Sequence, residues 1–301
     1  MTTSVLLRRL TSRIEDFYKS QERVCPPLNW KWCALVILAV VCVLFARCPS
    51  AFLRPGMWCE DGRIFFLGAW NDGWRSLFIP YNKYLHLLTR AFALIGVHIS
   101  ADWIPEIYFL SWLFVLVCLE AFILRVSWLS NVERILFAFS VVLAPHRGET
   151  LYNLTNMHWY LSLGFFFLLS APAVLLWFAC ACSIIVLQGA GHLSRKIHGY
   201  VPLRADRYFL VPYVIFCFTL VRLFARSSGR AMRSFSVCVT VVALTATTIP
   251  RFSIPEKPDV GWRGRMKSYR TRGHATFIDN SQRGDGRWEF ELDACQGGAK
   301  R

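Results

Sequence analysis

The chain has 301 residues, of which 55% are hydrophobic and 18% charged, and its mean hydropathy is +0.38. Nearly charge-free apolar runs alternate with short basic stretches, a pattern that excludes an ordinary soluble domain and is typical of a polytopic membrane protein. The net charge of +15 does not indicate nucleic-acid binding. Positive-inside topology and attraction to anionic headgroups account for basic residues that lie between apolar runs and in the tail.

The amino-terminal segment, residues 1–30, carries five basic residues: Arg8, Arg9, Arg13, Lys19 and Arg23. It is too long and too basic ahead of the apolar run for an ordinary cleaved signal, so we expect it to be cytoplasmic. The first span then runs from about Lys31 to Arg47. It leaves an extracytoplasmic loop, residues 48–104, on the far side of the membrane.

An acidic pair, Glu60-Asp61, stands in the aromatic stretch 58–65 of this loop. Carboxylates just outside a bilayer core are costly to desolvate and are rarely there without a function. The pair is therefore our candidate for the chemistry. Residues 62–74 are predicted to form a short amphipathic helix, for which Asp61 is also a candidate N-cap.

A second helix is predicted after the turn that Pro80 opens. One stripe of this helix consists of Tyr84, Leu88, Phe92 and Ile95, and His86 and Arg90 share another face. Two such helices would lie in the membrane interface with aromatic anchors. This purely structural interpretation accounts for the helices as well as a functional one does.

The second span is predicted from about Pro105 to Arg125 and contains one carboxylate, Glu120. We expect Glu120 to snorkel or to pair with Arg125 near the inner surface. A proton relay would need acidic partners in other spans, and the sequence offers none. A transporter is therefore less well supported.

A third span, about residues 135–145, follows a short loop with Glu133 and Arg134 and is short for a crossing. Residues 151–193 lack Asp, Glu, Lys and Arg, and they form either one kinked span or a hairpin bent at Pro172. Further spans, at about 208–221 and 235–250, are joined by a loop with four arginines. That loop is predicted to be cytoplasmic, which favours the hairpin and about seven crossings.

The loop 145–159 concentrates polar groups at the mouth of an apolar run. Asparagines, a threonine, a histidine and a carboxylate beside aromatic rings suit a hydroxyl-rich ligand such as a sugar. A capped, solvated loop with an interfacial tryptophan explains the same residues. The glycosylation sequon Asn153-Leu154-Thr155 in this loop is a degenerate signal.

Most of the eleven cysteines fall in apolar runs, where a thiol acts as a small hydrophobe. Cys48 and Cys59 differ, because both flank the first loop and would pair in an oxidising compartment. No Cys/His set has the spacing of metal ligands.

The tail, residues 251–301, changes to mixed charge and contains two short strand patterns, 275–278 and 288–292, which predict a hairpin. It is too small for an independent catalytic domain. Its basic residues are Arg263, Arg265, Lys267, Arg270 and Arg272. They form a solvated face or bind an anionic glycan or lipid headgroups.

Segments 58–65, 80–87 and 149–159, in this order, resemble bacterial integral-membrane glycosyltransferases of the GT-C superfamily, of the type that modifies O-antigen and other envelope glycans. The resemblance covers roughly the first 165 residues, and it rests on the ordered set because each motif alone is degenerate. Weaker likenesses follow at Arg207-Tyr208 and in the tail. The chain has fewer spans than the family, which implies a shortened member or an inactive paralogue.

The resemblance implies that Asp61 is the catalytic base, with Glu60 beside it, and that the donor is a sugar on a polyprenyl phosphate. A carboxylate near a low-dielectric wall is suited to take the proton of an acceptor hydroxyl. The lipid phosphate that leaves needs a cation, and the fork of an arginine matches it. Candidates are Arg90, Arg147 and Arg207. No metal or other cofactor is required, although a divalent metal fits the same chemistry.

We therefore expect an all-α polytopic protein of the bacterial inner membrane, with a cytoplasmic N-terminus, about six to seven transmembrane helices within residues 31–250, interfacial helices in the first loop and a small extracytoplasmic tail. Its partners would be membrane lipid, a polyprenyl-phosphate sugar and an envelope glycan acceptor. The predicted substrate-binding residues are Tyr81, Asn82, Tyr84, His86, Arg90, Glu149, Asn156, His158, Trp159, Arg207 and Tyr208. The alternative is a non-catalytic membrane protein, either a flippase-like subunit or one that binds lipid-linked sugars.

Overall fold

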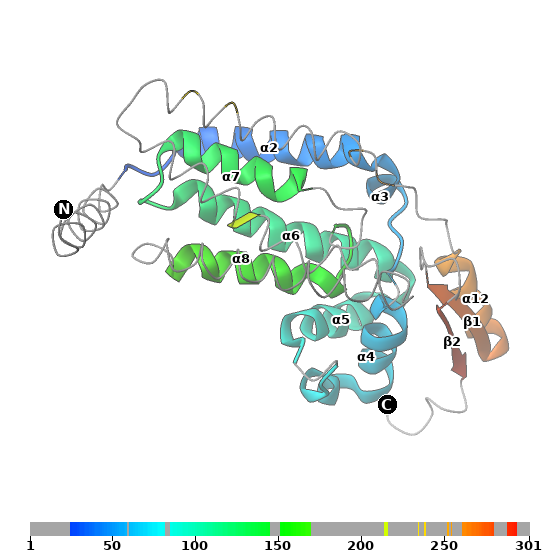
Figure 1. The fold of residues 1–301 in the computed structure, drawn as a ribbon. Helices are drawn as coiled ribbons and strands as arrows, with labels where there is room; N and C mark the ends of the chain where they lie inside the picture. Colours follow the sequence, from blue (N-terminus) through cyan, green and yellow to red (C-terminus); the bar gives the residue numbers. More distant parts are fainter. Residues whose placement is uncertain are drawn as a thin grey trace, which may run out of the picture. The chain divides into compact units, whose positions relative to one another are not determined.

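The computed structural model describes residues 25–58, 60–81, 85–144, 151–169, 261–279 and 288–293, with a few single positions between 214 and 254. These residues are mostly helical (Figure 1). The chain divides into two compact units. Unit 1 comprises residues 1–41, 119–145 and 162–250, and unit 2 comprises residues 42–118, 146–161 and 251–301. The predicted spans after residue 170 lie outside the described residues.

Among the residues that the structure describes, two helical segments have the length and composition of a membrane span. They are α2, Trp30–Arg47, and the 25 residues Ala101–Arg125, most of which form α6, Ile104–Arg125. Both helices coincide with the first two predicted spans. Large apolar side chains stay exposed along them, including Trp32, Leu35, Leu38, Leu110 and Phe114.

The third predicted span is the helix α7, Asn131–Leu143. It begins earlier than expected, because Ser130 and Glu133 form a capping box: Glu133 N donates to Ser130 Oγ at 3.3 Å, and Ser130 N donates to Glu133 Oε2 at 2.7 Å. Glu133 and Arg134 therefore lie in the first turn of a helix, and the prediction of a loop there was wrong. With 13 residues, α7 is about 20 Å long, shorter than the apolar core of a bilayer.

Replacement of Ser130 by alanine is expected to lower the free energy of unfolding by about 1 kcal/mol, because it removes one half of the capping box. Thermal unfolding of the purified protein in detergent measures this effect. The control is Ser127→Ala, at an exposed serine whose side chain makes no hydrogen bond to the described residues. Equal unfolding temperatures for the two variants would show that the cap contributes nothing.

Two buried or half-buried arginines join the chain around the amino-terminal end of α2. The guanidinium of Arg134 donates to the carbonyl oxygens of Pro26, Cys25 and Val126. Arg125 donates to Leu28 O at 3.2 Å and lies over the Trp30 ring at 4.4 Å. The start of α2 and the end of α6 therefore lie at the same end of unit 1.

The expected pairing of Glu120 with Arg125 is not formed. Glu120 is buried, and its carboxylate oxygens have no hydrogen-bond partner among the residues that the structure describes. Arg125 instead bonds to the backbone, because the carbonyl of Leu28 lies within its reach.

In unit 2, the first loop folds into short helices. After α3, Pro49–Leu53, come the π-helix η1, Asp61–Phe66, the helix α4, Leu67–Asp72, and the 3-10 helix η2, Gly73–Phe78. The single helix predicted over 62–74 is thus three successive helical segments. Gly73, with a φ of 55° and a ψ of −133°, ends α4 in a conformation open mainly to glycine.

The helix α5, Leu87–Ile99, follows and contacts η1, α4 and η2. It begins later than the sequence predicted, with His86 at its N-cap position. His86 and Arg90, which share one face of the predicted helix, are both buried. Beyond the loop lie the 3-10 helix η3, Ala101–Trp103, and, further along, the 3-10 helix η4, Thr155–Met157, which leads into α8, His158–Leu169.

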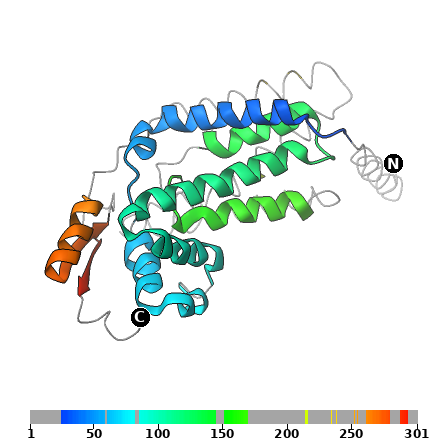
Figure 2. The same ribbon diagram turned by 180° about the vertical axis from the view of Figure 1, so that it is seen from behind.

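The tail contains the predicted hairpin and one helix that the sequence did not predict. The strands β1, His274–Asp279, and β2, Trp288–Asp293, pair antiparallel, with Phe277 opposite Phe290 and their rings stacked at 5.1 Å. The helix α12, Trp262–Arg272, precedes them and ends at Gly273. Figure 2 shows α12 beside the hairpin.

The tail belongs to the core of unit 2. The Trp262 ring lies 4.6 Å from that of Phe277 and 5.0 Å from that of Phe66 of η1, and its Nε1–H donates to Ala101 O at 2.7 Å. The first residues of the tail contact the end of α2, since Ile254 N donates to Arg47 O at 3.0 Å. The tail and the first loop therefore fold together.

Candidate functional site

Asp61, the candidate base, is the first residue of η1 and is only 1% exposed. Its Oδ2 accepts a hydrogen bond from Trp58 N at 3.0 Å. Its Oδ1 accepts two, from Thr155 N at 2.8 Å and from Thr155 Oγ1 at 2.6 Å. One carboxylate thus joins two segments that lie 94 residues apart.

These bonds correct the expectation that Asp61 caps the helix that follows it. Its side chain accepts from Trp58, which precedes it, and from Thr155, and Glu60 takes the N-cap position without a side-chain cap. These donors satisfy both carboxylate oxygens of Asp61 away from water.

The segment that contacts Asp61 is held in place by Tyr152, three residues before Thr155. Tyr152 has a φ of 61°, a conformation that costs a non-glycine residue about 1 kcal/mol or more. Its hydroxyl donates to Leu44 O at 2.8 Å, and its ring lies 5.1 Å from that of Trp112. Burial raises the pKa of the Tyr152 phenol, so this hydroxyl stays protonated as the donor at neutral pH.

Asn153 and Asn156 shape the turn at Thr155. The Oδ1 of Asn153 accepts from the backbone N and the Nδ2 of Asn156 at 3.0 and 3.1 Å, and its own Nδ2 donates to Leu151 O. Both asparagines are 1% exposed. The sequon residue Asn153 is therefore a buried structural residue and not an accessible acceptor for a glycan.

Two histidines and three aromatic residues form a cluster next to this link. The ring of His86 lies 5.4 Å from that of Phe65, 5.6 Å from that of Tyr81 and 5.1 Å from that of His158. His158 also lies 4.9 Å from Trp159. The Nδ1 of His158 is 2.9 Å from Thr155 O, and because a carbonyl only accepts, Nδ1 carries the proton.

Arg90 brings a buried positive charge to the same cluster. It is 3% exposed, and its guanidinium lies 5.4 Å from the centre of the Phe65 ring. Its Nε is buried and has no hydrogen-bond acceptor among the described residues. Burial lowers the pKa of Arg90, and the charge of Asp72 opposes that effect. An anionic ligand could accept a hydrogen bond from this buried Nε–H.

Gly68 makes room for this arginine. A Cβ at Gly68 would lie only 3.1 Å from Nη1 of Arg90. A side chain at this position would require the guanidinium to shift by a few tenths of an ångström. The position of Arg90 thus depends on two elements, α4 and α5.

Most of the predicted site residues that the structure describes lie in one connected cluster of unit 2. The contacts run from Asp61 through Thr155 to His158, and from there to His86, Tyr81, Phe65 and Arg90. Glu60, 6% exposed, precedes Asp61 in the chain, Trp159 packs on His158, and Asn156 bonds to Asn153 in the turn at Thr155. Other candidates lie outside the described residues: Asn82, Tyr84, Arg147, Glu149, Arg207 and Tyr208.

Three residues of this cluster were not singled out from the sequence: Trp58, Phe65 and Thr155. Thr155 belongs to the loop 145–159, and the many polar residues of that loop were the sequence feature that pointed to it. Nothing local in the sequence marks Phe65 as the ring between His86 and Arg90.

Cys48 is a buried free thiol, with its Sγ 3.4 Å from Ser50 Oγ, so the proposed pairing with Cys59 is not formed. Cys59 lies outside the described residues. Among the residues that the structure describes, no group of three or more His, Cys, Asp or Glu side chains could hold a metal ion.

No family model, no curated protein and no solved structure matches the chain. The resemblance to the GT-C superfamily therefore stays a prediction from the sequence.

Proposed function

We propose that this protein is a polytopic membrane glycosyltransferase that moves a sugar from a polyprenyl-phosphate donor to an envelope glycan or lipid-linked saccharide on the extracytoplasmic side. The observation that carries the proposal is the link between Asp61 and Thr155. It joins the acidic motif of the first loop to the polar loop before α8, the two segments on which the GT-C resemblance depends. If the GT-C resemblance were accidental, there would be no reason for the segments that carry Asp61 and Thr155 to be in contact.

The membrane topology is part of this proposal. With residues 1–30 in the cytoplasm, α2 leads out and α6 leads back, and further spans bring the total to about six or seven in a bacterial inner membrane. Arg125 and Arg134 bond to residues 25–28, which supports placing the start of α2 and the end of α6 on one side. That side is basic, as a cytoplasmic side should be.

The extracytoplasmic tail has similar support. Phe252 and Ile254 bond to Arg47 at the end of α2, and Trp262 bonds to Ala101 just before α6. Both anchor points are at the ends of the helices that border the first loop. The tail and the loop 48–104 therefore belong on the same side of the membrane.

In the proposed reaction, the Asp61 carboxylate takes the proton of an acceptor hydroxyl while the oxygen attacks the anomeric carbon. The bond from that carbon to the phosphate oxygen breaks, and its electron pair leaves with the lipid phosphate. The three hydrogen bonds to Asp61 fix the direction of the carboxylate before the substrate arrives. Glu60 would share the proton, and His86, His158, Trp159 and Tyr81 would line the sugar pocket.

Arg90 is the proposed partner of the departing phosphate. Its buried guanidinium offers donors to a dianion in a site where charges interact more strongly than in water. No metal is needed for that role.

Replacement of Arg90 by glutamine is expected to lower transfer by about 100-fold or more, because a preorganised cation at the leaving group is lost. Arg90→Lys should recover only part of the rate, because lysine keeps the charge and loses the fork. The matched control is Arg75→Gln, at an exposed arginine of the same loop. Equal rates for Arg90→Gln and Arg75→Gln, at equal protein levels, would remove Arg90 from the site.

The proposed function is tested with the purified full chain in proteoliposomes. The vesicles contain a polyprenyl-phosphate hexose and an extract of envelope glycans, and release of polyprenyl phosphate is followed. We expect release with the native protein and none with Asp61→Asn. The same slow release with both proteins would contradict the proposal.

A second candidate is a non-catalytic protein that binds lipid-linked sugars, such as a flippase-like subunit. One observation favours it: the Asp61 carboxylate accepts three hydrogen bonds, as a purely structural link does. Such a protein would bind the donor lipid and release no polyprenyl phosphate.

A further inference from the structure

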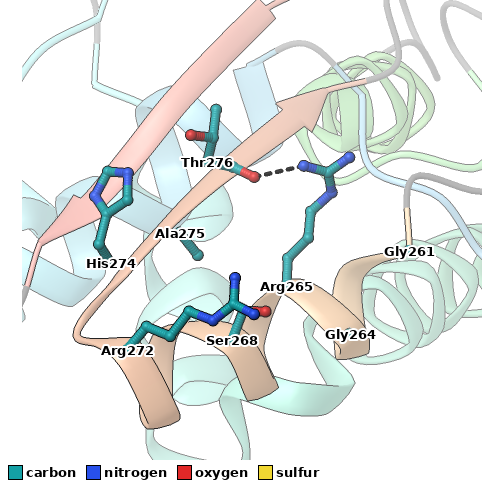
Figure 3. A pocket seen from close by; sticks show the side chains of 8 residues that line it. All are labelled: Gly261, Gly264, Arg265, Ser268, Arg272, His274, Ala275 and Thr276. Atoms are coloured by element: carbon teal, nitrogen blue, oxygen red, sulfur yellow. Dashed lines mark hydrogen bonds between the residues drawn. The ribbon is translucent and has the colours of Figure 1, made fainter.

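A basic groove of about 550 Å³ runs between α12 and β1 in the tail, apart from the cluster around Asp61. Figure 3 shows the guanidinium groups of Arg265 and Arg272 in the space between the helix and the strand. The residues that line the groove are Gly261, Gly264, Arg265, Ser268, Arg272, His274, Ala275 and Thr276. None of them is acidic.

The groove occupies one face of α12, whose lining positions 261, 264, 265, 268 and 272 recur at helical spacing. Two other arginines hold the helix in place: Arg263 pairs with Glu106, and Arg270 pairs with Asp102 at 2.8 Å. Arg265 and Arg272 remain on the groove face of the helix, and Lys267 is exposed outside it.

The chemistry of the groove fits a phosphate group. Arg265 Nη1 donates to Thr276 O at 2.6 Å, which fixes this side chain across the groove. Arg272 is exposed, and Ser268 adds a hydroxyl donor. A Cβ added at Gly261 or Gly264 would meet nothing within 4 Å, so the helix surface between the cations is open to a ligand. On the neighbouring strand, Asp293 is paired with His274 at 2.6 Å, and Glu291 lies opposite Thr276.

The surroundings of the groove favour a lipid over a soluble ion. Asp102 and Glu106, which dock α12, stand at the start of the apolar segment Ala101–Arg125. Between them Trp103 is 50% exposed, with the guanidinium of Arg263 3.6 Å from its ring centre. Exposed tryptophans at the end of a span mark the depth of the headgroups. Under the proposed topology, α12 therefore lies at the membrane surface.

We propose that this groove binds the phosphate of an anionic phospholipid headgroup and so anchors the tail to the membrane surface. A soluble phosphate has the same chemistry, but only a lipid phosphate is concentrated at that depth. The inference rests on the membrane placement in the proposed function and does not depend on sugar transfer.

Native mass spectrometry of the detergent-purified full chain, titrated with phosphatidylglycerol or phosphatidylcholine, tests the proposal. Arg272→Gln removes a groove charge, and Gly264→Leu fills the groove without a change in charge. Because glycine weakens a helix interior, the leucine should also not unfold α12. Lys267→Gln is the control, because Lys267 is an exposed cation of the same helix outside the groove.

We expect the native protein to bind phosphatidylglycerol more tightly than phosphatidylcholine. Arg272→Gln and Gly264→Leu should each weaken the phosphatidylglycerol complex by about five-fold or more, the factor that one interfacial cation contributes, and Lys267→Gln by less. Equal binding by all four proteins would overturn the proposal. So would displacement of the lipid by inorganic phosphate at constant ionic strength, because it identifies a soluble-anion site. The measurement detects lipid binding and requires no sugar transfer, so it gives a valid result even if the protein has no glycosyltransferase activity.

Discussion

Replacement of Asp61 by asparagine is expected to lower sugar transfer by at least about 100-fold, the usual contribution of a general base. The amide cannot take a proton from the acceptor hydroxyl. It also places an NH2 group among three hydrogen-bond donors, from Trp58 and Thr155, where the carboxylate accepts from all of them. The measurement is the rate of polyprenyl-phosphate release per molecule of folded protein in proteoliposomes.

The control for this prediction is Thr155→Val, which keeps the carboxylate and removes the 2.6 Å bond from the threonine hydroxyl. A hydrogen bond to a charged group contributes about 1.5–3 kcal/mol, so this variant should be less stable and still active once corrected for folded protein. If Asp61→Asn and Thr155→Val retain the same activity per folded molecule, Asp61 is a structural link and not a base.

The second large effect is expected in stability. Replacement of Trp262 by alanine should lower the free energy of unfolding by about 3–5 kcal/mol, because a buried aromatic side chain at the centre of the tail is lost. Its ring packs on Phe66, Phe277 and Phe290, and its Nε1–H bonds to Ala101. Thermal unfolding in detergent, with limited proteolysis of the tail alongside, measures the loss.

The variant Trp262→Phe distinguishes the contribution of the aromatic ring from that of the hydrogen bond. It keeps most of the aromatic contact and loses the bond to Ala101, which should cost about 1 kcal/mol. An unfolding temperature of Trp262→Ala equal to that of the native protein would show that the tail is not packed on the first loop.

The helices that the sequence predicted well are those with long apolar runs. Residues 31–47 and 105–125 were expected as spans, and α2 and α6 begin and end within about one residue of them. The strands of the tail were also expected, because apolar and polar residues alternate there. Each of these patterns lies within one segment, so the segment's own sequence is enough to indicate its secondary structure.

The helix α12 was not predicted, because its sequence is mostly basic and its apolar stripe is only three residues long, Trp262, Met266 and Tyr269. What holds it is distant: Trp262 and Met266 are buried, and Asp102 and Glu106 pair with its arginines. Interactions of this kind cannot be recognised in a segment by itself. The capping box at Ser130 is different, because Ser130 and Glu133 lie only three residues apart and form a local helix-start signal. The prediction of a loop at Glu133 and Arg134 missed that signal.

The candidate site was predicted from the GT-C resemblance and from residue type more than from geometry. Asp61, His86 and Arg90 were chosen because carboxylates, imidazoles and guanidiniums suit transfer from a lipid phosphate, and all three are buried in one unit. The partner of Asp61 was not predictable. Thr155 lies 94 residues away, and only the fold brings its hydroxyl within 2.6 Å of the carboxylate.

The most direct test of the central claim is mass spectrometry of envelope glycans from cells with the gene, without it, and with Asp61→Asn at equal membrane abundance. The account predicts a hexose-sized mass difference that is present only when Asp61 is intact. Identical glycans in all three strains would contradict the glycosyltransferase and leave a binding protein as the function of this fold.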